Sequence, residues 1–251
     1  MNKLPRVTLL FWIMKIAATT LGETAGDLLS MTLKVGYAVS SMMLVGLLLV
    51  TLVTQLRSKQ YHPWLYWTVI LLTSTAGTTM SDYMDRTLGL GYAKGALMLA
   101  TILAAIFVYW RASAHSFSIQ HIRTLKGELL YWSAILFSNT LGTALGDFLA
   151  DNSGLGFAGG ALLIGGLLAL TAFATLSTRI SQTLLFWIAF VLTRPFGATM
   201  GDVLTKSTEK GGLNFGTIGS SAILGGILVM LILYTASSQQ KETGVVAKAA
   251  C

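Results

Sequence analysis

The sequence predicts an all-α, polytopic membrane protein of eight transmembrane helices, arranged as four parallel two-helix pseudo-repeats in two halves. Hydrophobic residues make up 54% of its 251 residues and charged residues only 11%, with a mean hydropathy of +0.69. These values lie outside the range of soluble globular domains. Four apolar runs approach the length needed to cross about 30 Å of hydrocarbon as a helix, at residues 35–56, 95–110, 154–176 and 218–234.

Four more polar segments precede these runs and align with one another without a gap. They read FWIMKIAATTLGETAGD, YWTVILLTSTAGTTMSD, YWSAILFSNTLGTALGD and FWIAFVLTRPFGATMGD. In each, a tryptophan is followed ten residues later by glycine and fifteen residues later by aspartate. A fixed internal period of this kind is the signature of a repeat architecture. The single transmembrane domain 1–251 therefore divides into repeats at about 9–57, 64–112, 129–178 and 184–236, with a cytoplasmic tail at 237–251.

Each repeat has a polar first helix and an apolar second helix. A Gly-aromatic pair opens the second helix nine residues after the aspartate in three copies, whereas Asn214-Phe215 in the fourth comes three residues late and lacks the glycine. The tryptophans are 55, 65 and 55 residues apart, which groups the repeats into two halves joined by a connector near residues 111–128. Two spans return the chain to the same side, so all four copies point the same way.

Charge and cysteine content limit the other possibilities. The net charge is +7, but the basic residues are scattered through loops rather than massed, so no nucleic-acid partner is expected. They are more numerous on the side of the two termini, which the positive-inside rule assigns to the cytoplasm. The amino-terminal segment has features of a secretory signal, but it recurs inside the chain and so belongs to the fold. Cys251, the single cysteine, excludes an internal disulfide framework.

The Trp, Gly and Asp positions, over about residues 9–236, resemble a family of bacterial inner-membrane proteins with four tandem repeats of unknown function. Each repeat of that family has two transmembrane segments and a characteristic tryptophan. The resemblance implies a multi-pass protein of the bacterial inner membrane, and it implies the handling of metal ions such as manganese.

Polar residues in the first helix of each repeat fall on one face, because positions three, seven, eleven and fifteen after the tryptophan are about one turn apart. This face carries Lys15, Thr19, Glu23, Asp27, Ser74, Thr78, Asp82, Asn139, Thr143, Asp147, Arg194 and Asp202. A charge in hydrocarbon costs at least about 2.5 kcal/mol, so the four faces should turn toward each other. Small residues spaced by four permit the close approach of helices. The packing glycines are Gly22, Gly26, Gly77, Gly142, Gly146, Gly197 and Gly201.

These oxygen-bearing side chains predict a site for a hard divalent cation. The expected metal ligands are the four repeat aspartates and a glutamate, namely Asp27, Asp82, Asp147, Asp202 and Glu23. Hydroxyl and amide groups of Thr19, Ser74, Thr78, Asn139 and Thr143 support them. Lys15 and Arg194 would pair with the carboxylates when the site is empty, or would be permanent counter-ions. Met80 and Met200 could add a softer ligand that tilts the choice toward manganese, or could serve in packing alone. The predicted function is export of such a cation with possible proton exchange, by a monomer or homodimer that needs no cofactor and has the lipid bilayer and a small inorganic cation as partners.

Other interpretations of the same residues stay open at this stage. The aspartates could instead bond to backbone donors of the next helix and fix the hairpin. The tryptophans Trp12, Trp67, Trp132 and Trp187 are expected to be anchors at the membrane interface. An exporter of organic cations or drugs, a channel and a sensor are the functional alternatives. The sequence has no HExxH motif or nucleophile elbow, so no enzyme is predicted.

Overall fold

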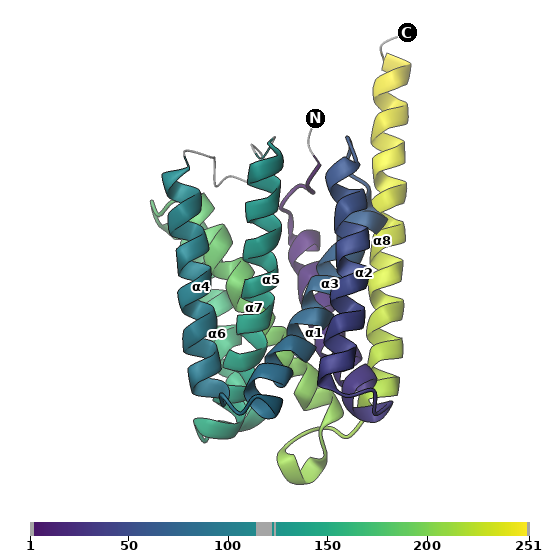
Figure 1. Ribbon diagram of the computed structural model, residues 1–251. Helices are drawn as coiled ribbons and strands as arrows, with labels where there is room; N and C mark the ends of the chain where they lie inside the picture. Colours follow the sequence, from purple (N-terminus) through teal and green to yellow (C-terminus); the bar gives the residue numbers. More distant parts are fainter. Residues whose placement is uncertain (1–2, 114–121, 123, 250–251) are drawn as a thin grey trace.

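The computed structural model describes residues 3–113, 122 and 124–249, and this part of the chain is all-α (Figure 1). Its eight α-helices are α1 (Leu9–Asp27), α2 (Tyr37–Arg57), α3 (Pro63–Asp82), α4 (Tyr92–Ala112), α5 (Leu125–Asp147), α6 (Gly156–Ser177), α7 (Gln182–Thr205) and α8 (Gly216–Ala249). Five are long and apolar enough to cross a membrane, namely α2, α4, α6, α7 and the Gly216–Ser238 part of α8. The predicted all-α class and the membrane-like character of these five helices are confirmed.

Local sequence signals set where several helices begin. The side chain of Thr8 accepts a hydrogen bond from the Phe11 backbone N–H at the start of α1, and Thr124 accepts one from Gly127 at the start of α5. Pro63 occupies the first turn of α3, where its missing N–H has no cost. α8 is 34 residues long and extends well past the other helices at the end of the bundle that carries both termini (Figure 1).

The four odd helices form a closed ring, in which α1 and α5 each pack against both α3 and α7. The helices touch at the glycine ten residues after each tryptophan. A methyl group on Gly77 would meet the backbone of Asn139 and Thr140, and one on Gly142 would overlap the side chain of Arg194. Gly22 meets Ser74 and Gly197 meets Thr19 in the same way. In every case the glycine contacts the residue seven after the tryptophan of the next repeat, so one contact recurs around the whole ring.

The even helices surround this ring, and each packs against the odd helix of the following repeat. α2 packs against α3, α4 against α5 and α6 against α7, while α8 returns to pack against α1. The strong helix pairs are therefore formed between repeats. The last repeat completes the first, so the arrangement has a circular order that the linear repeat pattern alone does not predict.

The turn between the two helices of a repeat has a recurring backbone form. In the first three copies the aspartate ends the α-helix and one π-helical turn follows it, at Leu28–Thr32, Tyr83–Thr87 and Phe148–Asn152. Two residues with positive φ, separated by one residue, then lie before or at the start of each even helix, and the pairs are Lys34/Gly36, Gly89/Gly91, Gly154/Gly156 and Asn214/Gly216. Glycine adopts positive φ without steric cost. Gly216 is therefore the counterpart of the glycine in the other copies, and Thr217 stands where they have an aromatic residue.

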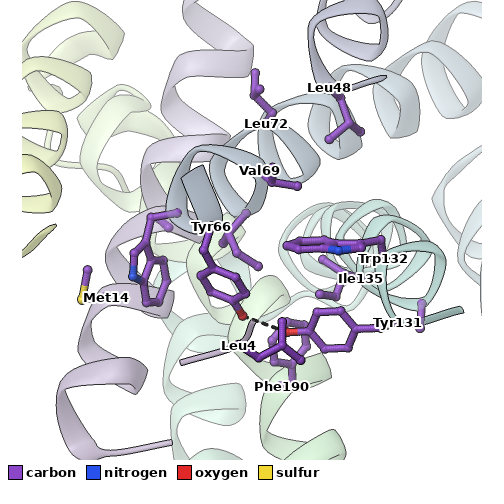
Figure 2. Close-up of a cluster of buried hydrophobic side chains, with 14 of the residues drawn as sticks. Leu4, Met14, Leu48, Tyr66, Val69, Leu72, Tyr131, Trp132, Ile135 and Phe190 are labelled. Carbon is purple, nitrogen blue, oxygen red and sulfur yellow. Dashed lines mark hydrogen bonds between the residues drawn. The ribbon is translucent and has the colours of Figure 1, made fainter. Parts of the chain in front are cut away.

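Aromatic side chains, among them Tyr66, Tyr131 and Phe190, lie in a buried hydrophobic cluster (Figure 2). Tyr66 and Tyr131 lie in the first half of α3 and α5. The hydroxyls of Tyr66 and Tyr131 form a buried hydrogen bond of 2.8 Å across α3 and α5. Trp67, Trp132 and Trp187 are buried in the same cluster, and Trp67 is only 1% exposed. These three tryptophans therefore pack inside the bundle, which corrects their predicted role as anchors at the lipid interface; Trp12 is half-buried.

Candidate functional site

The ring of odd helices turns its polar face inward. All twelve polar residues predicted for this face, from Lys15 to Asp202, are buried. Because α1, α3, α5 and α7 run side by side, successive helical turns form layers along the ring axis. The layers differ in their charged residues and in the contacts that these residues make, and the layers do not all belong to one site.

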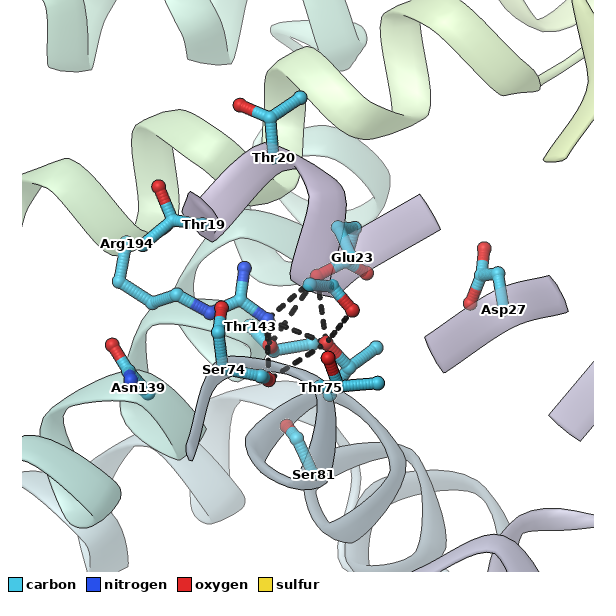
Figure 3. A network of polar contacts seen from close by, with 12 residues as sticks. Thr19, Thr20, Glu23, Asp27, Ser74, Thr75, Ser81, Asn139, Thr143 and Arg194 are labelled. Carbon is cyan, nitrogen blue, oxygen red and sulfur yellow. Dashed lines mark hydrogen bonds and ion pairs between the residues drawn. The ribbon is translucent and has the colours of Figure 1, made fainter. Parts of the chain in front are cut away.

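Arg194 occupies the middle layer, and one nitrogen of its guanidinium contacts three other helices (Figure 3). Its Nη2 lies 2.8 Å from Oε2 of Glu23 on α1, and 2.6 Å from each of the hydroxyls of Thr78 on α3 and Thr143 on α5. The equivalent position on α7 is Ala198, so Arg194 reaches this level from one turn earlier in its own helix. The expected pairing of Arg194 with a carboxylate is thus present in the structure.

Lys15 lies in the layer closer to the aromatic cluster and contacts no carboxylate at ion-pair distance within the described residues. Its Nζ donates to Oδ1 of Asn139 over 3.3 Å and lies 4.1 Å from the centre of the Phe190 ring. Asn139 in turn donates through Nδ2 to the hydroxyl of Thr73. Lys15 is therefore held by an amide and an aromatic face, and the pairing with a carboxylate that the sequence suggested is absent here.

The repeat aspartates form the layer farthest from the aromatic cluster, and two basic residues bridge them in pairs. Lys206 Nζ lies 2.7 Å from Oδ2 of Asp27 and 3.1 Å from Oδ1 of Asp202. Arg86 contacts Asp82 at 3.0 Å and Asp147 at 3.3 Å. Each of these two bridges, called clamps below, joins the aspartate of the cation's own repeat to the aspartate of the next repeat around the ring.

Arg86 and Lys206 belong to the candidate site, and sequence reasoning missed them. Each lies four residues after the aspartate of its repeat, a spacing that places opposite charges on one side of a helix. The first and third copies have Met31 and Asp151 there, so the signal appears only when copies two and four are compared directly.

Lys206 lies just beyond the end of α7, and its charge is stabilised by its partners. Burial opposes the charge, but the attraction of Asp202 and Asp27 outweighs burial and raises the pKa of Lys206 above its ordinary value. For Arg86, burial is likewise outweighed by Asp82 and Asp147, and its pKa is raised. Both clamp residues are therefore positively charged throughout the physiological pH range.

Three carboxylates meet closely enough to share one ion. Glu23, Asp147 and Asp202 each offer an oxygen, and these atoms lie within 4.8 Å of one another. They come from α1, α5 and α7, and all three side chains are buried. Asp27 and Asp82 belong to the clamps but not to this group, so the five predicted ligands divide into a close triad and two flanking aspartates.

The hydroxyl-bearing residues that were predicted to support the metal ligands also fall in different places. Thr78 and Thr143 contact both Arg194 and Glu23, which places them beside the triad. Thr19 instead donates to the backbone carbonyls of Lys15 and Thr193, and so it stabilises the crossing of α1 and α7. The hydroxyl of Ser74 is buried without a hydrogen-bond partner among the described residues.

Comparison with known proteins agrees with the repeat pattern. No curated protein and no solved structure matches the chain. One family model matches it four times, at residues 10–61, 65–116, 130–181 and 185–241, which together cover most of its length. The chain therefore belongs to the family described as Repeat of Unknown Function (DUF347).

Proposed function

We propose that this protein is a membrane transporter that exports a hard divalent cation, with manganese favoured, through the centre of the helix ring. The observation that carries the proposal is the buried triad of Glu23, Asp147 and Asp202, whose oxygens lie within 4.8 Å of one another. Carboxylate and hydroxyl oxygens are the ligands that hard cations prefer. Thr78 and Thr143 add hydroxyl oxygens beside Glu23.

The charge of the aspartate layer supports a divalent substrate. Four aspartates and two clamp cations leave this layer with a formal charge of −2. Uncompensated charge inside a membrane protein is costly and is normally matched by a partner. A divalent cation would neutralise the layer, whereas a monovalent one would leave half of the excess charge.

The clamps suggest how access from one side would be controlled. In the proposed eight-span topology both termini are cytoplasmic, and the protein lies in a bacterial inner membrane. The two halves, repeats one and two and repeats three and four, would then be joined at the external end by the Arg86 and Lys206 clamps. Opening both clamps would separate the halves there, while the Tyr66–Tyr131 cluster keeps the cytoplasmic end closed. Protons compete with metal ions for carboxylates, so proton entry could drive cation exit.

An exporter of organic cations is the runner-up. Such a protein needs a cavity lined by aromatic residues, and the structure has a candidate. A cavity of about 630 Å³ lies between α4 and α7 and is lined by Phe107, Trp187 and neighbouring apolar residues. Its charged lining residue is Arg111, which repels a cation, and the cavity's lining includes no carboxylate. The metal proposal is therefore favoured over the organic cation.

Reconstituted transport tests the proposal. Proteoliposomes with an entrapped manganese-sensitive dye should show protein-dependent manganese movement that other hard divalent cations compete with. Glu23→Gln, Asp147→Asn and Asp202→Asn should each slow it by at least about 10-fold. Asp151→Asn is the matched control, because Asp151 is an exposed carboxylate of the same end and should be dispensable. Wild-type protein that moves no divalent cation, or triad variants that move it at full rate, would contradict the proposal.

A further inference from the structure

The two adjacent layers that contain Lys15 and Arg194, together called the cation layer below, have an excess of buried positive charge. Both side chains are 0% exposed. Glu23 is the carboxylate that contacts Arg194, and within the described residues no carboxylate pairs with Lys15. Two cations and one carboxylate give the cation layer a formal charge of +1.

The two cations lie in the same part of the ring. Lys15 Nζ is 4.1 Å from the Phe190 ring, and Phe190 is one helical turn before Arg194 on the inner face of α7. Lys15 also contacts Asn139, which is one turn before Thr143 on α5, and Thr143 contacts Arg194. Residues one turn apart on a helix have Cβ atoms about 5–6 Å apart, so two helices independently place Lys15 about one helical turn from Arg194.

Hydrogen-bond donors in the cation layer exceed the acceptors. Nη2 of Arg194 is matched by Glu23 and two hydroxyls, but Nε and Nη1 are buried without a partner among the described residues. Lys15 has three N–H groups and one amide acceptor. Buried polar groups without partners are costly, and a buried cation without a counter-ion more so.

A small anion would both neutralise the excess positive charge and accept the unmatched N–H groups. Water would accept the free N–H groups but would leave the charge, and a neutral Lys15 would remove the charge but leave Nε and Nη1 of Arg194 unmatched. We propose that Lys15 and Arg194 form a binding site for one small monovalent anion of the size of chloride. Asn139 orients the ammonium group of Lys15 toward it.

Lys15 and Asn139 of the anion site do not belong to the carboxylate triad. Lys15 and the triad residue Glu23 are eight residues apart on α1, which corresponds to about 12 Å along the helix. Arg194 binds Glu23 through Nη2, whereas Nε and Nη1 are the atoms left for the anion. The test below therefore changes Lys15 and Asn139, whose replacement leaves the three carboxylates of the triad in place.

Thermal unfolding of the purified protein in detergent, at constant ionic strength, tests the site. Replacing sodium gluconate by sodium chloride should raise the midpoint by about 2–4 °C once chloride is well above its dissociation constant, and the rise should saturate. Nitrate and formate should act like chloride, whereas sulfate should not. Lys15→Met should abolish the response. Arg57→Met removes an exposed cation at the end of α2 and should keep it.

A second variant tests the same idea without removing a cation. Asn139→Asp places a carboxylate beside Lys15, so the protein supplies its own negative charge and should lose the chloride response while remaining folded. Line broadening of the chloride NMR signal by wild-type protein should disappear in both Lys15→Met and Asn139→Asp. Equal stabilisation of all variants by chloride and gluconate, or an intact response in Lys15→Met or Asn139→Asp, would overturn the proposal.

Discussion

The Oε2 atom of Glu23 lies 2.8 Å from Nη2 of Arg194, and this ion pair joins the first repeat to the last at the centre of the ring. Both side chains are almost completely buried, at 4% and 0% exposure. Removing one partner of a buried ion pair leaves the other as an uncompensated charge, which is more damaging than removing both. The asymmetry of the first repeat, which alone has a glutamate at this level, is therefore matched by the asymmetry of the fourth, which alone has an arginine.

Glu23→Gln should lower the free energy of unfolding by about 3–5 kcal/mol, because Arg194 then remains buried without a counter-ion. The double variant Glu23→Gln/Arg194→Met should recover much of that loss. Denaturant unfolding in detergent measures both. Losses that simply add in the double variant would show that the two side chains do not stabilise each other.

Gly77→Ala should destabilise the ring by about 1–3 kcal/mol, because the new methyl group would press against the backbone of α5 at Asn139 and Thr140. Gly46→Ala in α2 is the matched control, since the space around Gly46 is open and alanine favours helix. Thermal unfolding should therefore give opposite shifts for the two variants. A destabilised Gly46→Ala protein would argue that the effect comes from helix propensity or lipid contact instead of ring packing.

Tyr66→Phe should cost about 1–3 kcal/mol, because the hydroxyl of Tyr131 is then buried without a partner. Tyr66→Phe/Tyr131→Phe removes both hydroxyls and should be closer to wild type in unfolding experiments. If the double variant is less stable than Tyr66→Phe, the hydroxyl pair stabilises the protein by more than the hydrogen bond that each hydroxyl provides for the other.

The stability of the protein should fall as the pH rises above about 10.4, the ordinary lysine pKa, in part because of Lys206. Its folded-state pKa is raised, so in this range the unfolded lysine loses its proton while the folded one keeps it. The contribution of Lys206 is complete below that pH and declines above it. Lys206→Arg remains charged in both states and should show a shallower decline in unfolding free energy between pH 10 and 12. Identical slopes for the two proteins would mean that Lys206 is not held by Asp27 and Asp202.

Much of the ring interior followed from helical periodicity. The spacing of Glu23, Thr78, Thr143 and Arg194 relative to each tryptophan predicted which side chains face inward, because a charge that cannot face lipid must face protein. Periodicity does not say which helix lies next to which. For that reason it predicted five equivalent ligands, whereas the structure groups Glu23 with Asp147 and Asp202 and bridges the other aspartates through the clamps.

Helical periodicity could not predict two features, namely the burial of a tryptophan and the continuation of a helix through a proline. The burial of Trp67 depends on the packing of neighbouring helices, and the sequence of one helix gives a tryptophan the same pattern at an interface or in a core. Pro195 lies inside α7 although proline cannot donate a backbone hydrogen bond, and the helix continues through it to Thr205.

The return of α8 to α1 means that the ring has no structural start, and the chain could be opened at a different loop without losing any helix pair. Both ends of the chain lie on the same side of the bundle (Figure 1). A gene cut between the second and third repeats would yield two polypeptides, each of which supplies the contacts that the other lacks. Two short proteins of two repeats each could build the same helix ring by association, which makes gene duplication and fusion a direct route to the present four-repeat chain.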